Sequence, residues 1–107
     1  MVQFSPTLLD AEFAALADAN RRQILDRVTV GAVSISDLAA PLGISLPGVL
    51  KHVHALEAAH LIETDKRGRT RWCRLGDRPL DAAAAWMEER RRTWDRRLDR
   101  FVQDLGR

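Results

Sequence analysis

The chain has little cysteine and no long apolar run, which argues against a disulfide-stabilised protein and against a membrane protein. Its 107 residues include a single cysteine, Cys73, so no disulfide can form within one chain, and cysteine usage gives no sign of an oxidising compartment. No apolar run approaches membrane-spanning length, and residues 1–5 lack the basic segment followed by a long apolar run that begins a secretion signal. We therefore expect a cytoplasmic protein with no membrane partner.

Signatures of catalysis and of metal binding are also missing. There is no Ser/His/Asp set, no pair of carboxylates on an evident cleft and no glycine-rich phosphate loop after a strand. The three histidines are His52, His54 and His60, and the spacing of the first two places them on different faces of one helix. We predict that the protein is not an enzyme and that it needs no metal or cofactor.

Length and composition favour one globular domain spanning residues 1–107. The mass is 12.1 kDa, 46% of residues are hydrophobic and 30% are charged, which suits a folded domain with one core. The formal net charge is only +2, but six of the 17 lysines and arginines lie in one short stretch, opposed by Asp65 and Asp77. This stretch contains Lys66, Arg67, Arg69, Arg71, Arg74 and Arg78. A local basic patch attracts polyanions, whereas the alternative is a solvated surface strip.

Helical spacing of apolar residues predicts two helices at the start of the chain. The first covers residues 7–16, where the apolar residues Leu8, Leu9, Phe13 and Leu16 recur at helical spacing. Asp18 is placed to cap a second helix, which Gly31 would end.

A helix-turn-helix is predicted over residues 34–59. Ser34 or Ser36 would open its first helix, and Gly43 lies where a C-terminal cap belongs. Ser45 would cap the second helix, with Pro47 in the first turn. Its buried stripe would be Val49, Val53 and Leu56, and its outward positions would be Gly48, Lys51, His52 and Ala55. In this motif the second helix is the usual reader of a DNA groove.

From residue 61 onward the pattern of apolar residues changes from the helical period to the period of two that is typical of strands. Residues 61–64 and 70–75 are predicted as two strands joined by a turn at residues 66–69, which makes a hairpin over 61–75. Arginines surround Gly68 at the tip of this hairpin, where they can reach a phosphate or the minor groove.

A long helix is predicted over residues 79–106. One heptad seam of this helix holds Leu80, Ala84, Met87, Trp94, Leu98, Phe101 and Leu105, with Arg91 as its one polar member. So regular a seam on a chain with so small a core favours association with a second copy. The predicted dimer interface comprises Leu8, Leu9, Phe13, Met87, Trp94, Leu98, Phe101 and Leu105. The alternative is that the helix packs only on its own domain.

With these elements in place, the chain resembles the ArsR-type (ArsR/SmtB-like) winged helix-turn-helix repressors of bacteria. The resemblance rests on residues 16–25, 35–39, 45–53 and 56–62 and on the Arg67-Gly68-Arg69 sequence. It implies a mainly α fold with a small β-hairpin between the fourth and fifth helices. It also implies a dimer built from the first and last helices, and repression by operator binding.

Two departures from the family pattern concern metals. Metal-sensing members carry two cysteines where this chain has Ser34 and Ser36, and hydroxyl groups are poor ligands for thiophilic ions. Other members place histidine and carboxylate ligands on the last helix, but no histidine follows Pro79 here. We therefore expect a metal-independent member of the family.

The function predicted is that of a homodimeric transcriptional repressor that binds double-stranded DNA at an inverted-repeat operator. Lys51 and His52 would meet base edges and adjoining phosphates, and the hairpin arginines would contact the backbone or the minor groove. The predicted DNA-binding residues are Ser45, Pro47, Gly48, Lys51, His52, Arg67, Arg69 and Arg71.

Two other functions stay open at this point. The fold could serve protein association alone, or it could bind DNA and also sense an unidentified small ligand in a pocket at the dimer interface lined by Trp72, Trp86 and Trp94. Aromatic residues at such spacing are more typical of core or interface anchors. Cys73 could be a redox sensor, although a lone strand cysteine is more often an inert hydrophobic residue.

Overall fold

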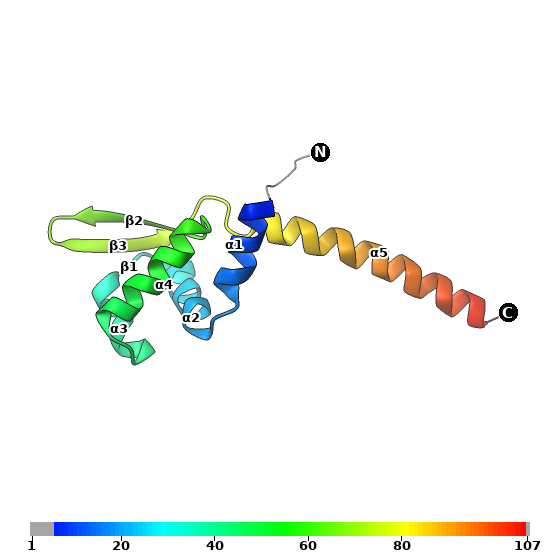
Figure 1. Cartoon of the computed structure of the whole chain (residues 1–107), viewed down its shortest axis with the longest axis horizontal. Coiled ribbons are helices and arrows are strands. Elements are labelled where there is room, and N and C mark those ends of the chain that lie inside the picture. The colour runs from blue at the N-terminus through cyan, green and yellow to red at the C-terminus, as the bar shows by residue number, and fades with distance from the viewer. Residues whose placement is uncertain (1–5, 107) are drawn as a thin grey trace.

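The computed structural model describes residues 6–106, which form a helical body with a hairpin at one end and a long helix leaving the other (Figure 1). The arrangement is mainly α with a small antiparallel sheet, as the sequence predicts. In chain order the elements are α1 (Pro6–Leu16), α2 (Ala19–Val30), β1 (Val33–Ser34), α3 (Ile35–Leu42), α4 (Leu46–Ala58), β2 (Ile62–Arg67), β3 (Thr70–Leu75) and α5 (Asp81–Leu105).

Local capping chemistry sets where three of the helices begin. The side chains of Asp18, Ser34 and Ser45 each accept a hydrogen bond from the backbone N–H three residues further on, at 3.1–3.3 Å. Each bond satisfies a donor that the first turn of a helix cannot pair internally. The predicted caps are confirmed, and the third helix starts after Ser34 rather than Ser36. Gly43 ends that helix in the left-handed conformation, with φ 66°.

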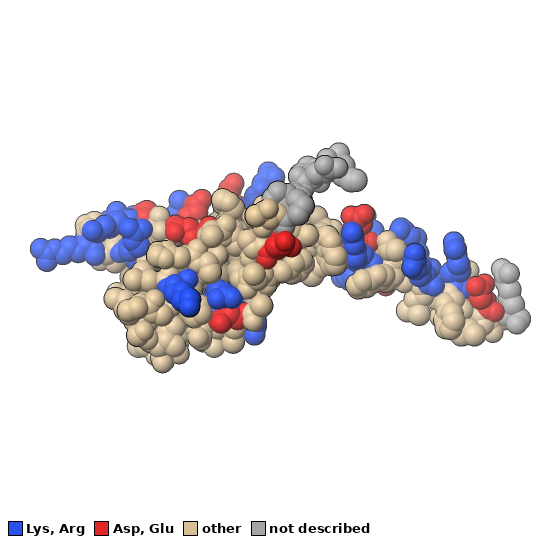
Figure 2. All heavy atoms as spheres, viewed as in Figure 1, with Lys and Arg blue, Asp and Glu red and all other residues tan. Residues whose placement is uncertain are grey.

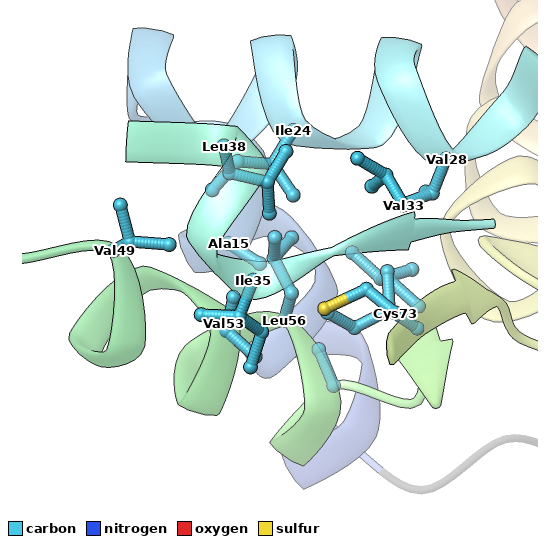
Figure 3. Packing of buried hydrophobic residues seen from close by; sticks show 13 residues of the cluster. Ala15, Ile24, Val28, Val33, Ile35, Leu38, Val49, Val53, Leu56 and Cys73 are labelled. Atoms are coloured by element: carbon cyan, nitrogen blue, oxygen red, sulfur yellow. The ribbon is translucent and has the colours of Figure 1, made fainter. Parts of the chain in front are cut away.

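One hydrophobic core joins the helical body to the sheet (Figure 3). The predicted stripe of α4 is confirmed, because Val49, Val53 and Leu56 are at most 1% exposed. They pack in one cluster with Ala15, Ile24, Val28, Val33, Ile35, Leu38, Ala59, Leu61, Ile62 and Cys73.

The sheet has the strand order β1-β3-β2 and is antiparallel throughout. Sequence reasoning missed β1, whose two residues are too few to show a period of two. It also ended the first hairpin strand at Thr64, whereas β2 runs to Arg67. The ribbon between Thr64 and Arg67 projects from the core, so Lys66 and Arg67 stay exposed within a paired strand, whereas Asp65 is half-buried. The turn is therefore the dipeptide Gly68-Arg69, and Gly68 has the positive φ of 64° that such tight turns need.

Gly76 anchors the hairpin to the end of α4. Its N–H donates to the carbonyl of Leu61 at 2.9 Å, and a Cβ on this residue would lie 2.5 Å from the carbonyl oxygen of His60. Such close backbone contact leaves room for glycine alone.

The long helix starts later than the sequence predicts. Leu80 has φ 67°, outside the helical region, so α5 begins at Asp81, and Leu80 packs against the core instead of continuing the seam. Leu80 has no side-chain oxygen to cap the helix. The carboxylate of Glu12 in α1 takes over that function, accepting a hydrogen bond from the N–H of Ala83 at 2.7 Å.

Only the first turns of α5 pack on the body. Ala82 and Ala83 are buried, whereas every residue from 91 to 106 except Thr93 is exposed. The helix therefore projects, and the described part of the molecule measures 68 × 31 × 22 Å. Among residues 6–106, no helix combines the length and apolar character required to cross a bilayer.

We predict that the Glu12 carboxylate stabilises the fold by holding α5 to α1. Glu12 is 2% exposed, so Glu12→Ala leaves the Ala83 N–H without its buried acceptor and should lower the free energy of unfolding by about 1–3 kcal/mol. Glu12→Gln keeps an acceptor oxygen and should lose less. Urea unfolding measures both, with the exposed Asp10→Ala as control. Equal stability of Glu12→Ala and Asp10→Ala would contradict this role.

Candidate nucleic-acid interface

A sharp turn presents the N-terminus of α4 to solvent. The Gly43 N–H donates to the carbonyls of Ala39 and Ala40 at 3.0 and 3.1 Å, which closes α3 and lets α4 begin after Ser45. Ser45 and Pro47 are exposed there, and Gly48 is half-buried. The Ser45 Oγ accepts from the Gly48 N–H at 3.3 Å and keeps its own hydrogen for an acceptor such as a phosphate oxygen. The positive end of a helix favours an anion at this place.

Of the two polar residues predicted to face outward from α4, the structure exposes Lys51 and half-buries His52. The His52 side chain is 16% exposed, and its Nδ1 lies 3.3 Å from Nη1 of Arg21 in α2. The expectation that His52 faces outward is wrong. Position 52 follows Val49 by three residues and precedes Leu56 by four, so helical geometry places it on the flank of the buried stripe.

The hairpin concentrates cations at its free end, as Figure 2 shows. Its arginines differ in their surroundings. Nε of Arg67 pairs with Asp65 at 3.0 Å, and Nη1 of Arg71 donates to the Thr64 hydroxyl at 3.2 Å. Arg69, in the turn itself, is exposed and has no hydrogen bond or ion pair within residues 6–106. Because an exposed ion pair contributes little, Arg67 can exchange Asp65 for a phosphate. Arg69 is free to bind one directly.

Cys73 lies in the core and faces α4. The pKa of its thiol is raised to about 11, chiefly by desolvation on burial; the nearby Glu57 carboxylate adds to the rise and Arg71 opposes it. The thiol is therefore protonated at neutral pH, and the thiolate is the reactive form. The buried side chain behaves as a small hydrophobic residue.

Within one chain the three tryptophans do not line a common pocket. Trp72 lies on the hairpin, whereas Trp86 and Trp94 lie on α5 at the other end of the molecule (Figure 1). Trp86 makes an edge-on contact with Phe13, with ring centroids 5.9 Å apart, and Trp94 is 62% exposed. A hollow of about 580 Å³ lies elsewhere, between α2 and α3, and is lined by residues such as Ile24 and Leu42.

The residues predicted for a dimer interface fall into two groups within one chain. Leu8, Leu9 and Phe13 lie on α1 beside the first turns of α5 (Figure 1). The others share one face of α5, and their side chains are 43–69% exposed: Met87, Trp94, Leu98, Phe101 and Leu105. Val102, 58% exposed, widens this stripe, although the strict heptad seam leaves it out.

Sequence reasoning assigned no role to Arg21 or Glu12, which hold elements together across the fold. Arg21 contacts a residue 31 positions away, and Glu12 contacts one 71 positions away. No periodic pattern links residues so far apart. A glutamate on the inner side of α1 was the one available signal, because a buried carboxylate needs a partner.

Comparisons with known proteins agree with this arrangement. Residues 16–65 match the family model of a helix-turn-helix domain. The chain is 33% identical over 94 residues to the HTH-type transcriptional regulator Rv2034 of Mycobacterium tuberculosis, and the match covers 88% of this chain and 85% of that protein. A crystal structure of an ArsR family transcriptional regulator is similar with a TM-score of 0.80 and 40% identity, covering 89% of this chain and 97% of the other.

The chain belongs to the ArsR-type winged helix-turn-helix regulators. A further relative of this ArsR-type regulator is the transcriptional repressor SdpR of Bacillus subtilis, 31% identical over 75 residues, which are 70% of this chain and 83% of SdpR. The family consists of DNA-binding transcription regulators rather than enzymes. In this fold α4 is the recognition helix and the β2–β3 hairpin is the wing.

For this ArsR-type regulator we predict that a substitution in α4 and a substitution in the wing change DNA binding in different ways. Lys51→Ala should weaken operator binding by about 1–3 kcal/mol and relax the preference at one position of each half-site, because a base contact is lost. Arg69→Ala should weaken operator and random DNA together, and the slope of log affinity against log salt should become shallower by about one unit per lost phosphate contact.

Salt titrations of both variants on operator and random duplexes make this measurement. Arg100→Ala removes the same charge from exposed α5 and should leave both the affinity and the slope unchanged. The assignment of roles is wrong if Arg69→Ala alters base preference while Lys51→Ala does not.

Proposed function

We propose that the protein is a homodimeric repressor that binds an inverted-repeat operator. The exposed apolar stripe of α5, formed by Met87, Trp94, Leu98, Phe101, Val102 and Leu105, carries this proposal. A small monomer rarely leaves so continuous an apolar surface in water. The name of the relative SdpR, a transcriptional repressor, supports repression as the outcome of binding.

Two copies joined through α1 and α5 would present two recognition helices related by a twofold axis. Each helix would enter the major groove at its N-terminal end, where Ser45, Pro47, Gly48 and Lys51 lie. Each wing would bring Arg67, Arg69 and Arg71 to the flanking backbone. The operator should therefore be an inverted repeat with half-site centres roughly 10–10.5 base pairs apart, or a multiple of that spacing.

The stripe of α5 predicts a dimer at micromolar concentration. Leu98→Asp places a charge within the stripe and should shift the sedimentation coefficient to that of one chain, with loss of operator affinity. Gln103→Asp introduces the same charge on the opposite face of α5 and should leave the protein dimeric. A wild-type monomer, with Leu98→Asp unchanged from it, would refute the dimer.

Repression by this protein is proposed to be independent of metal. The Ser34 Oγ accepts from the Asp37 N–H and lies 3.3 Å from the Ser36 hydroxyl, so both hydroxyl groups stand at the cap of α3. Neither offers the soft thiolate that thiophilic ions need, and the Cys73 thiol is buried and protonated.

Operator affinity should accordingly stay constant when zinc, cadmium or arsenite is added at low micromolar concentration. Fluorescence anisotropy of labelled operator measures this, and a chelator-treated sample gives the reference. A large metal-induced loss of binding that Cys73→Ser or His60→Ala abolishes would reveal a site between subunits and overturn metal independence.

A further inference from the structure

The guanidinium of Arg21 connects two helices that have separate functions in the proposed repressor. Its Nε and Nη2 donate to the carbonyls of Ala15 and Ala14, both at 2.9 Å, in the last turn of α1. Its Nη1 lies 3.3 Å from Nδ1 of His52, in the middle of α4. One side chain therefore joins the end of α1 to the recognition helix.

The chemistry of this contact assigns the roles of its two atoms. A guanidinium has donors only, so in a hydrogen bond between the two residues the Nδ1 of His52 is the acceptor. The Asp18 Oδ1 lies 4.0 Å from the same Nδ1 and accepts from the Arg21 backbone N–H at 3.1 Å. That N–H bond is the main cause that holds the pKa of Asp18 below its ordinary value. The carboxylate therefore stays charged beside the guanidinium.

Polar contacts add directional constraints to the apolar packing of α4, among them the bond from the Thr64 hydroxyl to the Glu57 carboxylate at 2.8 Å. Val49, Val53 and Leu56 hold the helix in the core through contacts that have no preferred direction. A hydrogen bond depends on angle as well as distance, so the Arg21–His52 contact constrains both the rotation of α4 and its position along its axis. Lys51 is exposed and lies next to His52 in the sequence, so its position is set together with the rotation of α4.

We propose that Arg21 and His52 are a pair of positioning residues that set the orientation of the recognition helix relative to α1, and that His52 contributes to DNA binding through this contact rather than by reading a base. This inference rests on the proposed function, in which α1 belongs to the dimer interface and α4 reads the operator. The link would then set how two recognition helices in a dimer are placed.

Two amide substitutions separate positioning from base reading. The Oδ1 of asparagine can take the place of imidazole Nδ1, so His52→Asn keeps an acceptor for Arg21 and lacks a group at Nε2. Glutamine reaches the position of Nε2, so His52→Gln does the reverse. His52→Asn should bind the operator within about twofold of wild type, whereas His52→Gln and His52→Ala should bind about tenfold more weakly.

The pattern of base preference is the second readout. Binding of each variant to single-base substitutions of the operator should give the wild-type order at every position, because no base contact is removed. Relaxed preference at one position in His52→Asn, with His52→Gln like wild type, would show that Nε2 reads a base and would overturn the inference. Equal losses in all three variants would also overturn it, because the acceptor would then be irrelevant.

A double-mutant cycle tests whether the two residues act together. Arg21→Gln alone should weaken operator binding, and His52→Ala should cause no further loss in that background. A full tenfold loss from His52→Ala in the Arg21→Gln protein would overturn the coupling. Urea unfolding of each variant establishes that folded protein is compared. Wild-type protein that binds operator and random DNA equally would instead refute the proposed function, and with it the basis of this pair.

Discussion

A buried hydrogen bond from the Ala83 N–H to the carboxylate of Glu12 joins the start of α5 to α1, beside the buried Ala82 and the contact of Phe13 with Trp86. Glu12 is 2% exposed, and a carboxylate in such surroundings is tolerated only with a partner. The free N–H groups at the start of a helix supply that partner together with the favourable end of its dipole. The start of α5 is therefore joined to α1, and the rest of the helix with its apolar stripe projects beyond the body (Figure 1).

The last turn of α1 is held by Arg21, whose guanidinium donates to the carbonyls of Ala14 and Ala15. The same group contacts His52 in α4, so α1 has polar contacts with both the long helix and the recognition helix. In the proposed dimer these contacts define the distance and the angle between the twofold axis and each reading helix. Hydrogen bonds constrain both distance and angle. Such constraints matter here because the spacing of the operator half-sites fixes the distance between the two recognition helices.

In the proposed repressor, the wing would attract DNA of any sequence, and α4 would recognise the operator sequence. Its basic stretch includes Asp65, which pairs with Arg67 along the ribbon, and leaves Arg69 exposed at the tip. Charge at the tip of a hairpin acts on the phosphate backbone of any sequence and increases the local concentration of DNA. In the proposed function, discrimination between sequences would be made by α4, where Lys51 is exposed.

Local chemistry by itself determined much of this protein. The helix starts at Asp18, Ser34 and Ser45 follow from capping within three residues, and the buried stripe of α4 follows from its period. Tertiary structure alone decided the start of α5, the strand β1 and the partner of His52. Glu12 and Arg21 act on residues 71 and 31 positions away, and no sequence period encodes such distances. Folding brings these groups together because burial obliges each polar atom to find a partner, wherever in the chain that partner lies.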